Sequence, residues 1–229
     1  MDTPEHFNTP RNIRNTQDYR PNKGGKMKDL SDSKEPNVKT WFKKANRLLA
    51  EGRCEEALLY YDKILEVDPE DTRIWDNKGI ALSDMGRHLE AIECFEKALE
   101  LKPDNAKAWS NLGVTLGAFG KYEESIECFE KAIELKPESS RTWTNKGTAF
   151  FCLDRHSEAV ECFNQALKIN PKNSEAWAGK GSALRLLGEY KEAIESFEKF
   201  IELAPPKALP LIKQAKKIIK ELKKTLEET

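Results

Sequence analysis

Four basic residues recur at intervals of 34 residues along the chain: Lys39, Arg73, Lys107 and Arg141. Ammonium and guanidinium groups form charge-assisted hydrogen bonds with carboxylates and phosphates, so a row of them suits an acidic ligand. The last three are each followed, four positions later, by an asparagine: Asn77, Asn111 and Asn145. Amide side chains both donate and accept hydrogen bonds, which suits the backbone of an extended peptide. The two rows together predict a surface for a peptide that carries carboxylates or phosphates.

The basic row also fits a simpler interpretation. Lysine and arginine near helix starts are often only solvated, or paired with a neighbouring Asp or Glu, and then contribute little energy. The sequence leaves both interpretations open.

Residues that could support catalysis or bind a metal are few and are placed at packing positions. His88 and His156 occupy the position that Tyr122 and Tyr190 have in other segments. Three cysteines, again 34 residues apart, are typical of small apolar core residues and lack the paired spacing of zinc ligands: Cys94, Cys128 and Cys162. No phosphate-binding loop, dinucleotide-binding or hydrolase motif occurs. We therefore predict no catalytic residue, no metal site and no cofactor.

Composition narrows the class of protein further. Charged residues make up 34% of the 229 residues, yet the formal net charge is only −1. We expect no binding to nucleic acid, because bulk electrostatic attraction is missing. We expect no membrane association, because no apolar run approaches the roughly 20 residues that span a bilayer. Five cysteines without a secretory signal favour reduced thiols and a cytoplasmic location.

A repeat of 34 residues organises the chain. Prolines mark it at Pro69, Pro103, Pro137, Pro171 and Pro205, and tryptophans at Trp41, Trp75, Trp109, Trp143 and Trp177. An aromatic row has the same period: Tyr61, Phe95, Phe129, Phe163 and Phe197. If units are counted from residues 38, 72, 106, 140 and 174, positions 4, 8 and 11 of each unit have the i, i+4, i+7 spacing of one helix face. Positions 20, 24 and 27 repeat this spacing on a second helix. Each unit is thus predicted to be two helices that end at the proline.

This pattern resembles the tetratricopeptide repeat family, whose Trp, Gly, Ala, Phe and Pro positions it matches. The resemblance covers residues 38–206, in units 38–71, 72–105, 106–139, 140–173 and 174–207. One family position departs from the pattern, because the Leu before the Gly is Lys78, Lys146 or Lys180 in three units. The resemblance implies an all-α fold, a right-handed α-solenoid of five helix-turn-helix units.

In this family, one face of the first helices lines a concave groove that binds extended peptides. Carried onto this sequence, the groove residues are Lys39, Phe42, Asn46, Arg73, Asn77, Ile80, Lys107, Asn111, Val114, Arg141, Asn145 and Phe151. A subset of the family binds acidic chaperone C-termini with a carboxylate clamp. The corresponding positions here are Phe42, Asn46, Asn77, Lys107 and Asn111. Three of the five match, Asn46, Asn77 and Lys107, whereas Phe42 and Asn111 stand where the clamp has cations. This departure favours a looser acidic-peptide site on Asn46, Asn77 and Lys107 over a full clamp.

The ends and the second helices carry their own patterns. We expect residues 1–37 to form a disordered tail, and residues 208–229 to form an amphipathic, lysine-rich capping helix. On the second helices, Glu and Lys alternate at i, i+4 spacing, as in Glu93 and Lys97, which predicts ion pairs on an acidic convex side. By segment, residues 1–37 carry a net charge of +1, residues 38–206 one of −6 and residues 207–229 one of +4.

Taken together, these features predict a non-catalytic protein-interaction module or scaffold. Its partner is expected to be a protein or peptide, with an acidic segment favoured, that lies in the concave groove. An alternative remains open, in which the chain is a structural scaffold that self-associates through the solenoid ends and the convex face. The choice depends on surfaces that the repeat pattern alone does not define.

Overall fold

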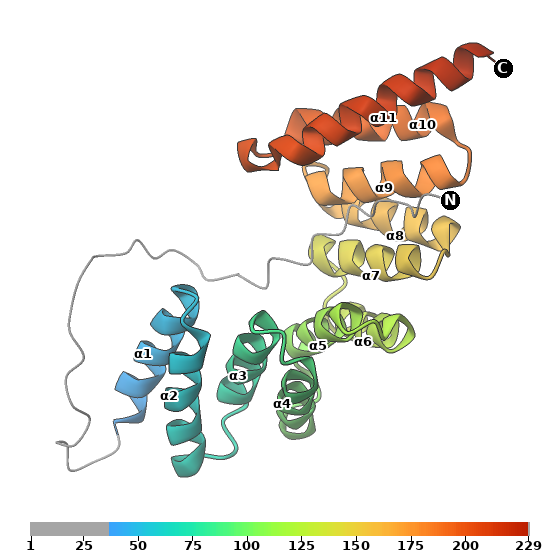
Figure 1. The fold of residues 1–229 in the computed structure, drawn as a ribbon. Coiled ribbons are helices and arrows are strands. Elements are labelled where there is room, and N and C mark those ends of the chain that lie inside the picture. The colour runs from blue at the N-terminus through green and yellow to red at the C-terminus, as the bar shows by residue number, and fades with distance from the viewer. Residues whose placement is uncertain (1–36, 229) are drawn as a thin grey trace. The chain divides into compact units, whose positions relative to one another are not determined.

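The structure, a computed structural model, describes residues 37–228 and consists of α-helices joined by short turns (Figure 1). Within this range no β-strand occurs. The predicted all-α fold is confirmed. The tail expected at residues 1–37 lies outside the described residues, apart from Asn37.

Ten helices form five pairs with one pair in each predicted unit. The first helices of the pairs are α1 (Val38–Ala50), α3 (Thr72–Asp84), α5 (Ala106–Ala118), α7 (Ser140–Cys152) and α9 (Ser174–Leu186). The second helices are α2 (Cys54–Val67), α4 (His88–Leu101), α6 (Tyr122–Leu135), α8 (His156–Ile169) and α10 (Tyr190–Leu203). A short 3₁₀ turn, Pro206–Ala208, then leads into α11 (Leu209–Glu228).

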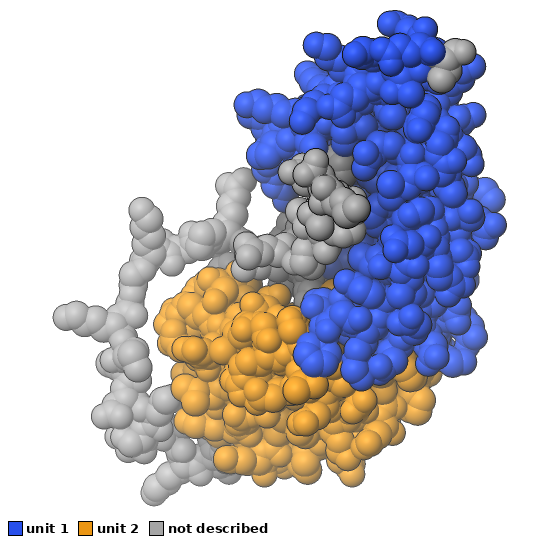
Figure 2. All heavy atoms as spheres, turned by 45° about the vertical axis from the view of Figure 1, so that its right-hand side comes forward, with its two compact units in different colours: residues 1–10, 116–229 blue, residues 11–115 orange. Residues whose placement is uncertain are grey.

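The chain divides into two compact units (Figure 2). The first part of the described chain, residues 37–115, holds α1 to α4 and most of α5, and the other part, residues 116–228, runs from the end of α5 to α11. In the first part α1 packs on α2, α2 on α3 and α3 on α4. In the other part the same succession runs from α6 through α10, and α11 packs on α10.

An aromatic residue of each second helix fills the core of its repeat. Phe95, Phe163 and Phe197 are at most 1% exposed. Each ring lies against a glycine of the first helix of the same repeat, where an added Cβ would approach to 3.0 Å or less: Gly79, Gly147 and Gly181. The repeated glycine and the repeated aromatic residue are therefore two halves of one packing contact.

The tryptophan and proline rows are also linked. The indole Nε1 of Trp75 donates to the backbone oxygen of Pro69 at 2.8 Å, and Trp109, Trp143 and Trp177 make the same bond to their preceding prolines at 2.8–3.1 Å. Each bond ties the loop that ends one repeat to the first helix of the next. This explains why the two residue types share one period.

The turn between the two helices of each repeat contains one residue in the left-handed backbone conformation. Gly52, Gly86, Gly120 and Gly188 have φ between 76° and 89°, which glycine adopts without steric cost. In the fourth repeat Asp154 occupies this place with φ of 56°.

The lysines that replace the family's leucine have a structural role. The Lys146 ammonium pairs with Glu130 of the preceding second helix at 2.8 Å, and it lies 5.7 Å from the centre of the Trp143 ring. Lys78 does the same with Asp62 and Trp75, at 2.7 and 5.5 Å. In both cases the apolar stem substitutes for leucine while the charged head bridges two repeats.

The ion pairs within the second helices differ from the expected i, i+4 pattern. Lys97, Lys131 and Lys199 each contact the glutamate three residues later, at 2.8–3.0 Å, and not the glutamate four residues earlier. The later glutamate in each case is the acid of the last helical turn, Glu100, Glu134 or Glu202. The earlier glutamates, Glu93 among them, are left without an ion pair within residues 37–228.

Candidate functional site

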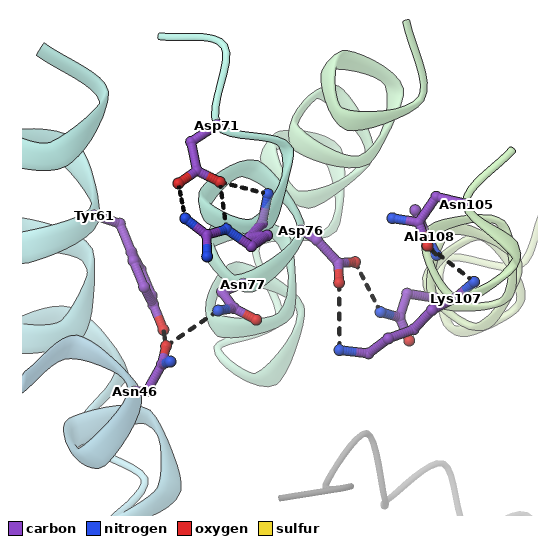
Figure 3. Close-up of polar contacts among 10 residues, drawn as sticks. Asn46, Tyr61, Asp71, Asp76, Asn77, Asn105, Lys107 and Ala108 are labelled. Atoms are coloured by element: carbon purple, nitrogen blue, oxygen red, sulfur yellow. Dashed lines mark hydrogen bonds and ion pairs between the residues drawn. The ribbon is translucent and has the colours of Figure 1, made fainter. Parts of the chain in front are cut away.

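A row of polar side chains crosses the first helices in residues 37–115 (Figure 3). Its first part joins α1, α2 and α3. The Tyr61 hydroxyl donates to Asn46 Oδ1 at 2.8 Å, and the Asn77 amide nitrogen donates to the same oxygen at 3.1 Å. Burial raises the pKa of Tyr61, so its hydroxyl stays a donor at all moderate pH values. The amide of Asn46 is thereby fixed with its oxygen toward these two donors.

The second part of the row joins α3 and α5 around a carboxylate. Asp76 accepts a hydrogen bond from the Asn111 amide nitrogen at 2.9 Å and pairs with the Lys107 ammonium at 3.4 Å. The Asp76 side chain is 7% exposed, whereas that of Lys107 is 60% exposed. A nearly buried carboxylate requires such partners, because desolvation without them is costly. Lys107 therefore compensates a charge of the chain itself.

Arg73 is likewise engaged within the chain. Its guanidinium contacts both carboxylate oxygens of Asp71, at 3.0 and 2.7 Å, and it stacks over the Phe42 ring at 5.2 Å. The Asp71 carboxylate also accepts from the backbone nitrogen of Arg73 and so begins helix α3. These hydrogen bonds from Arg73 hold the pKa of Asp71 below its ordinary value.

The other expected groove residues of this unit differ in exposure. Lys39 is exposed and forms no ion pair within the described residues. Phe42 and Val114 are half-buried, while Ile80 is only 7% exposed and offers little surface to a ligand. Among the expected groove residues of this unit, the exposed ones are the three cations Lys39, Arg73 and Lys107.

In residues 116–228 the expected site residues lie on α7. Arg141 is exposed and Asn145 is half-buried. Phe151 is half-buried, with its ring centre 5.3 Å from that of His156. The asparagine row ends at α9, where Gly179 stands in its place and faces the Phe163 ring.

Sequence reasoning missed the two carboxylates that hold the basic side chains. Asp71 is the residue just before α3, a position where aspartate commonly caps a helix, so the capping pattern could have indicated it. Asp76 is an acid at a position where the other repeats have Phe42, Ser110, Thr144 and Ala178. An acid at this position was a usable signal of a special role, although the partners of Asp76 could not be identified from the sequence.

The described residues offer little that could support catalysis. Burial raises the pKa of the Cys94 and Cys162 thiols to about 11, so they are protonated and poor nucleophiles at neutral pH. Between residues 37 and 228, no three His, Cys, Asp or Glu side chains are grouped to hold a metal ion. No helix in that range is both long and apolar enough to cross a membrane.

Solved structures of other proteins share the fold. MamA from Desulfovibrio magneticus RS-1 aligns with a TM-score of 0.68 at 24% identity, over 75% of this chain and 97% of that one. YrrB, titled a TPR protein with an unusual peptide-binding site, aligns with a TM-score of 0.63 at 24% identity, over 79% and 92%. PilF of Pseudomonas aeruginosa aligns with a TM-score of 0.68 at 21% identity, over 83% and 90%. No curated protein matches the chain.

Family models agree with the structural likeness. Three models described as tetratricopeptide repeat match the chain, one at residues 38–81, one at residues 70–138 and 104–172, and one at residues 144–208. Together they span all five predicted units. The glycine–aromatic contact and the tryptophan–proline bond recur through these units at the same period. The chain therefore belongs to the tetratricopeptide repeat family.

Proposed function

We propose that this protein is a non-catalytic interaction module that binds an extended segment of a partner protein along the first helices of its repeats. Membership of the family supports this role, and the similar fold of YrrB, a TPR protein described as having an unusual peptide-binding site, supports the class of ligand. The polar row in residues 37–115 carries the proposal, because its amides are oriented by bonds within the chain.

The orientation of the amides determines what a ligand can offer. Asn46 uses its oxygen for Tyr61 and Asn77, so its nitrogen is left to donate to a carbonyl group of a ligand. Asn77 and Asn111 donate their nitrogens to neighbours, so their oxygens are left to accept from ligand N–H groups. A backbone that presents both kinds of group matches this arrangement, and the fixed amides lower the ordering cost of binding.

Charge narrows the preferred ligand. Arg73 and Lys107 each have a carboxylate of the chain beside them, so they attract an acidic ligand less than their number suggests. Lys39 and Lys43 on α1 are exposed and have no ion pair within the described residues. We therefore expect acidic side chains of a peptide bound to residues 37–115 to lie near these two lysines.

The test starts with a library of extended peptides, from which binders are selected on the full chain. The double variant Asn77→Ala, Asn111→Ala should weaken a selected peptide about tenfold, because each lost hydrogen bond contributes about 0.5–1.5 kcal/mol. Asn164→Ala on the second helix α8 is the matched control and should leave the affinity unchanged. Isothermal titration of each variant measures the change.

Charge is tested separately with the same peptides. Lys39→Glu with Lys43→Glu should weaken acidic peptides more than neutral ones, and the difference should shrink at high salt. Lys102→Glu with Lys136→Glu changes the same charge at exposed loop positions and serves as control. Failure to select any peptide, or equal affinity of the asparagine variants and the wild type, would contradict the proposed site.

A further inference from the structure

The outward face of α11 is a row of exposed lysines, called here the lysine stripe: Lys213, Lys216, Lys217, Lys220 and Lys224. At 100° per residue their side chains project within about 100° of one another. Two of them contact the glutamate four residues later, at 3.5 and 3.9 Å. The other three, Lys213, Lys216 and Lys220, have no carboxylate within ion-pair distance among residues 37–228.

The opposite face of α11 is used in packing. Ala215, Ile219 and Leu222 are at most 9% exposed and belong to one hydrophobic cluster with residues of α9 and α10. A helix that binds a lipid surface normally inserts its apolar face, and here that face is already covered. The lysine stripe therefore offers positive charge alone to a partner.

A complementary surface occurs on the second helix α4. Glu93, Glu96 and Glu100 are exposed and follow the same i, i+3, i+7 spacing as the three unpaired lysines. Seven residues of helix span about 10.5 Å, so the two rows have equal length. Glu100 contacts Lys97 at 2.8 Å but stays 66% exposed, and the other two form no ion pair within the described residues. We call these three residues the acidic face of α4.

Related acids in other repeats are held by a lysine of the following helix. The pairs are Asp62 with Lys78, Glu130 with Lys146, and Glu198 with Lys223, at 2.7–3.1 Å. Glu96 is the equivalent acid of α4, but the next repeat has Leu112 at the position of the lysine. Glu96 therefore has no lysine partner from the following helix. In the last pair Lys223 comes from α11, at the edge of the lysine stripe. The Lys223–Glu198 pair is thus an existing contact between a lysine of α11 and an exposed acid of a second helix.

We propose that the lysine stripe of one molecule docks on the acidic face of α4 of a second copy. Residues 38–206 carry a net charge of −6 and residues 207–229 one of +4, so two copies attract each other in this orientation. Membranes and nucleic acids also attract lysines, but the acidic repeats repel such polyanions. The two surfaces differ, so the contact is heterologous and either extends beyond the dimer or closes into a ring.

Sedimentation velocity of the full chain tests this inference over a series of protein concentrations. At roughly 0.05 M salt we expect concentration-dependent association, and at roughly 0.5 M salt we expect its loss, because exposed charges are then screened. The triple variant Lys213→Glu, Lys216→Glu, Lys220→Glu should raise the dissociation constant at least about tenfold. Circular dichroism and thermal melting verify that the variant is folded.

A charge exchange separates this contact from a general effect of charge. The variant Glu93→Lys, Glu96→Lys, Glu100→Lys should also fail to associate alone, while an equal mixture of the two triple variants should associate again. Lys136→Glu, Lys168→Glu, Lys172→Glu changes the net charge equally at exposed positions outside α4 and α11 and should associate like the wild type. A wild type that is monomeric at low salt, or an equal loss in this control, overturns the proposal. So does a mixture that stays dissociated.

Discussion

Gly179 provides the sharpest test of how the repeats pack. It stands in the asparagine row of the first helices, yet a Cβ built on it would lie 2.4 Å from Cζ of Phe163. The Phe163 ring is 1% exposed, and a Cβ built on Gly147 would also lie 2.8 Å from it. The buried ring thus lies close to two glycines, on α7 and α9, and has little room to move.

The variant Gly179→Ala places two opposing effects against each other. Alanine favours the helix over glycine by about 1 kcal/mol. Overpacking of a filled core costs about 1–3 kcal/mol, and a carbon more than 1 Å inside normal contact distance belongs at the upper end of that range. We therefore expect a net loss of about 1–2 kcal/mol in the free energy of unfolding.

Urea denaturation followed by circular dichroism measures this loss. Gly117→Ala is the matched control, because its added Cβ would meet only the Ser125 side chain, with the hydroxyl at 3.3 Å. That variant should be neutral or stabilised by up to about 1 kcal/mol, since the hydroxyl has to give way by only a few tenths of an ångström and the helix preference then prevails. Glycine to alanine is thus expected to lower the free energy of unfolding in α9 but not in α5.

A double-mutant cycle identifies the cause. Phe163→Leu destabilises by itself, because it leaves a cavity, but it removes the ring that Gly179→Ala would strike. The double variant should therefore lose less than the sum of the single losses, with a coupling of about 1 kcal/mol or more. Additive losses, or a neutral Gly179→Ala, would refute the steric explanation.

Three further predictions follow from other contacts. Asp154→Gly should raise the free energy of unfolding by about 1 kcal/mol, because Asp154 has φ of 56°, and thermal denaturation measures the gain. Lys146→Met keeps the apolar stem but removes the ion pair with Glu130, and we expect a loss of about 1–2 kcal/mol in urea denaturation, since Lys146 is 13% exposed. The pKa of Asp71 is lowered by Arg73, so its ion pair stabilises the fold fully above the unfolded pKa of about 3.9 and is lost as the pH falls through the lower folded pKa. Asp71→Asn should therefore be less stable than the wild type at neutral pH and equally stable in acid, as melting temperatures against pH would show.

Much of the fold follows from local patterns. The i, i+4, i+7 spacing and the proline row indicated two helices per unit, because helix faces and helix ends depend on neighbours along the chain. The contact between the glycines and the aromatic row appears only in the structure. Even the Lys146 and Lys78 exceptions were visible as departures, although their acidic partners were not.

The candidate site shows where this reasoning stops. The sequence placed Arg73, Lys107 and the asparagines in one row, and the capping pattern could have indicated Asp71 beside Arg73, but nothing in the sequence placed Asp76 beside Lys107. Asp76 and Asn111 are 35 residues apart, so their contact depends on how α3 packs on α5. The sequence left open whether the basic row is free or paired, and the structure pairs Arg73 and Lys107 with carboxylates.

The sequence by itself determined the repeat, the two helices of each unit and the kind of residue on each face. These properties depend on local geometry, which a 34-residue period repeats five times. Only the tertiary structure decided which charges remain available, because side chains from successive repeats meet at distances that the chain order does not contain. Lys107 is paired and Lys213 is not, although both are exposed lysines near the start of a helix, and only the neighbours brought by packing make that difference.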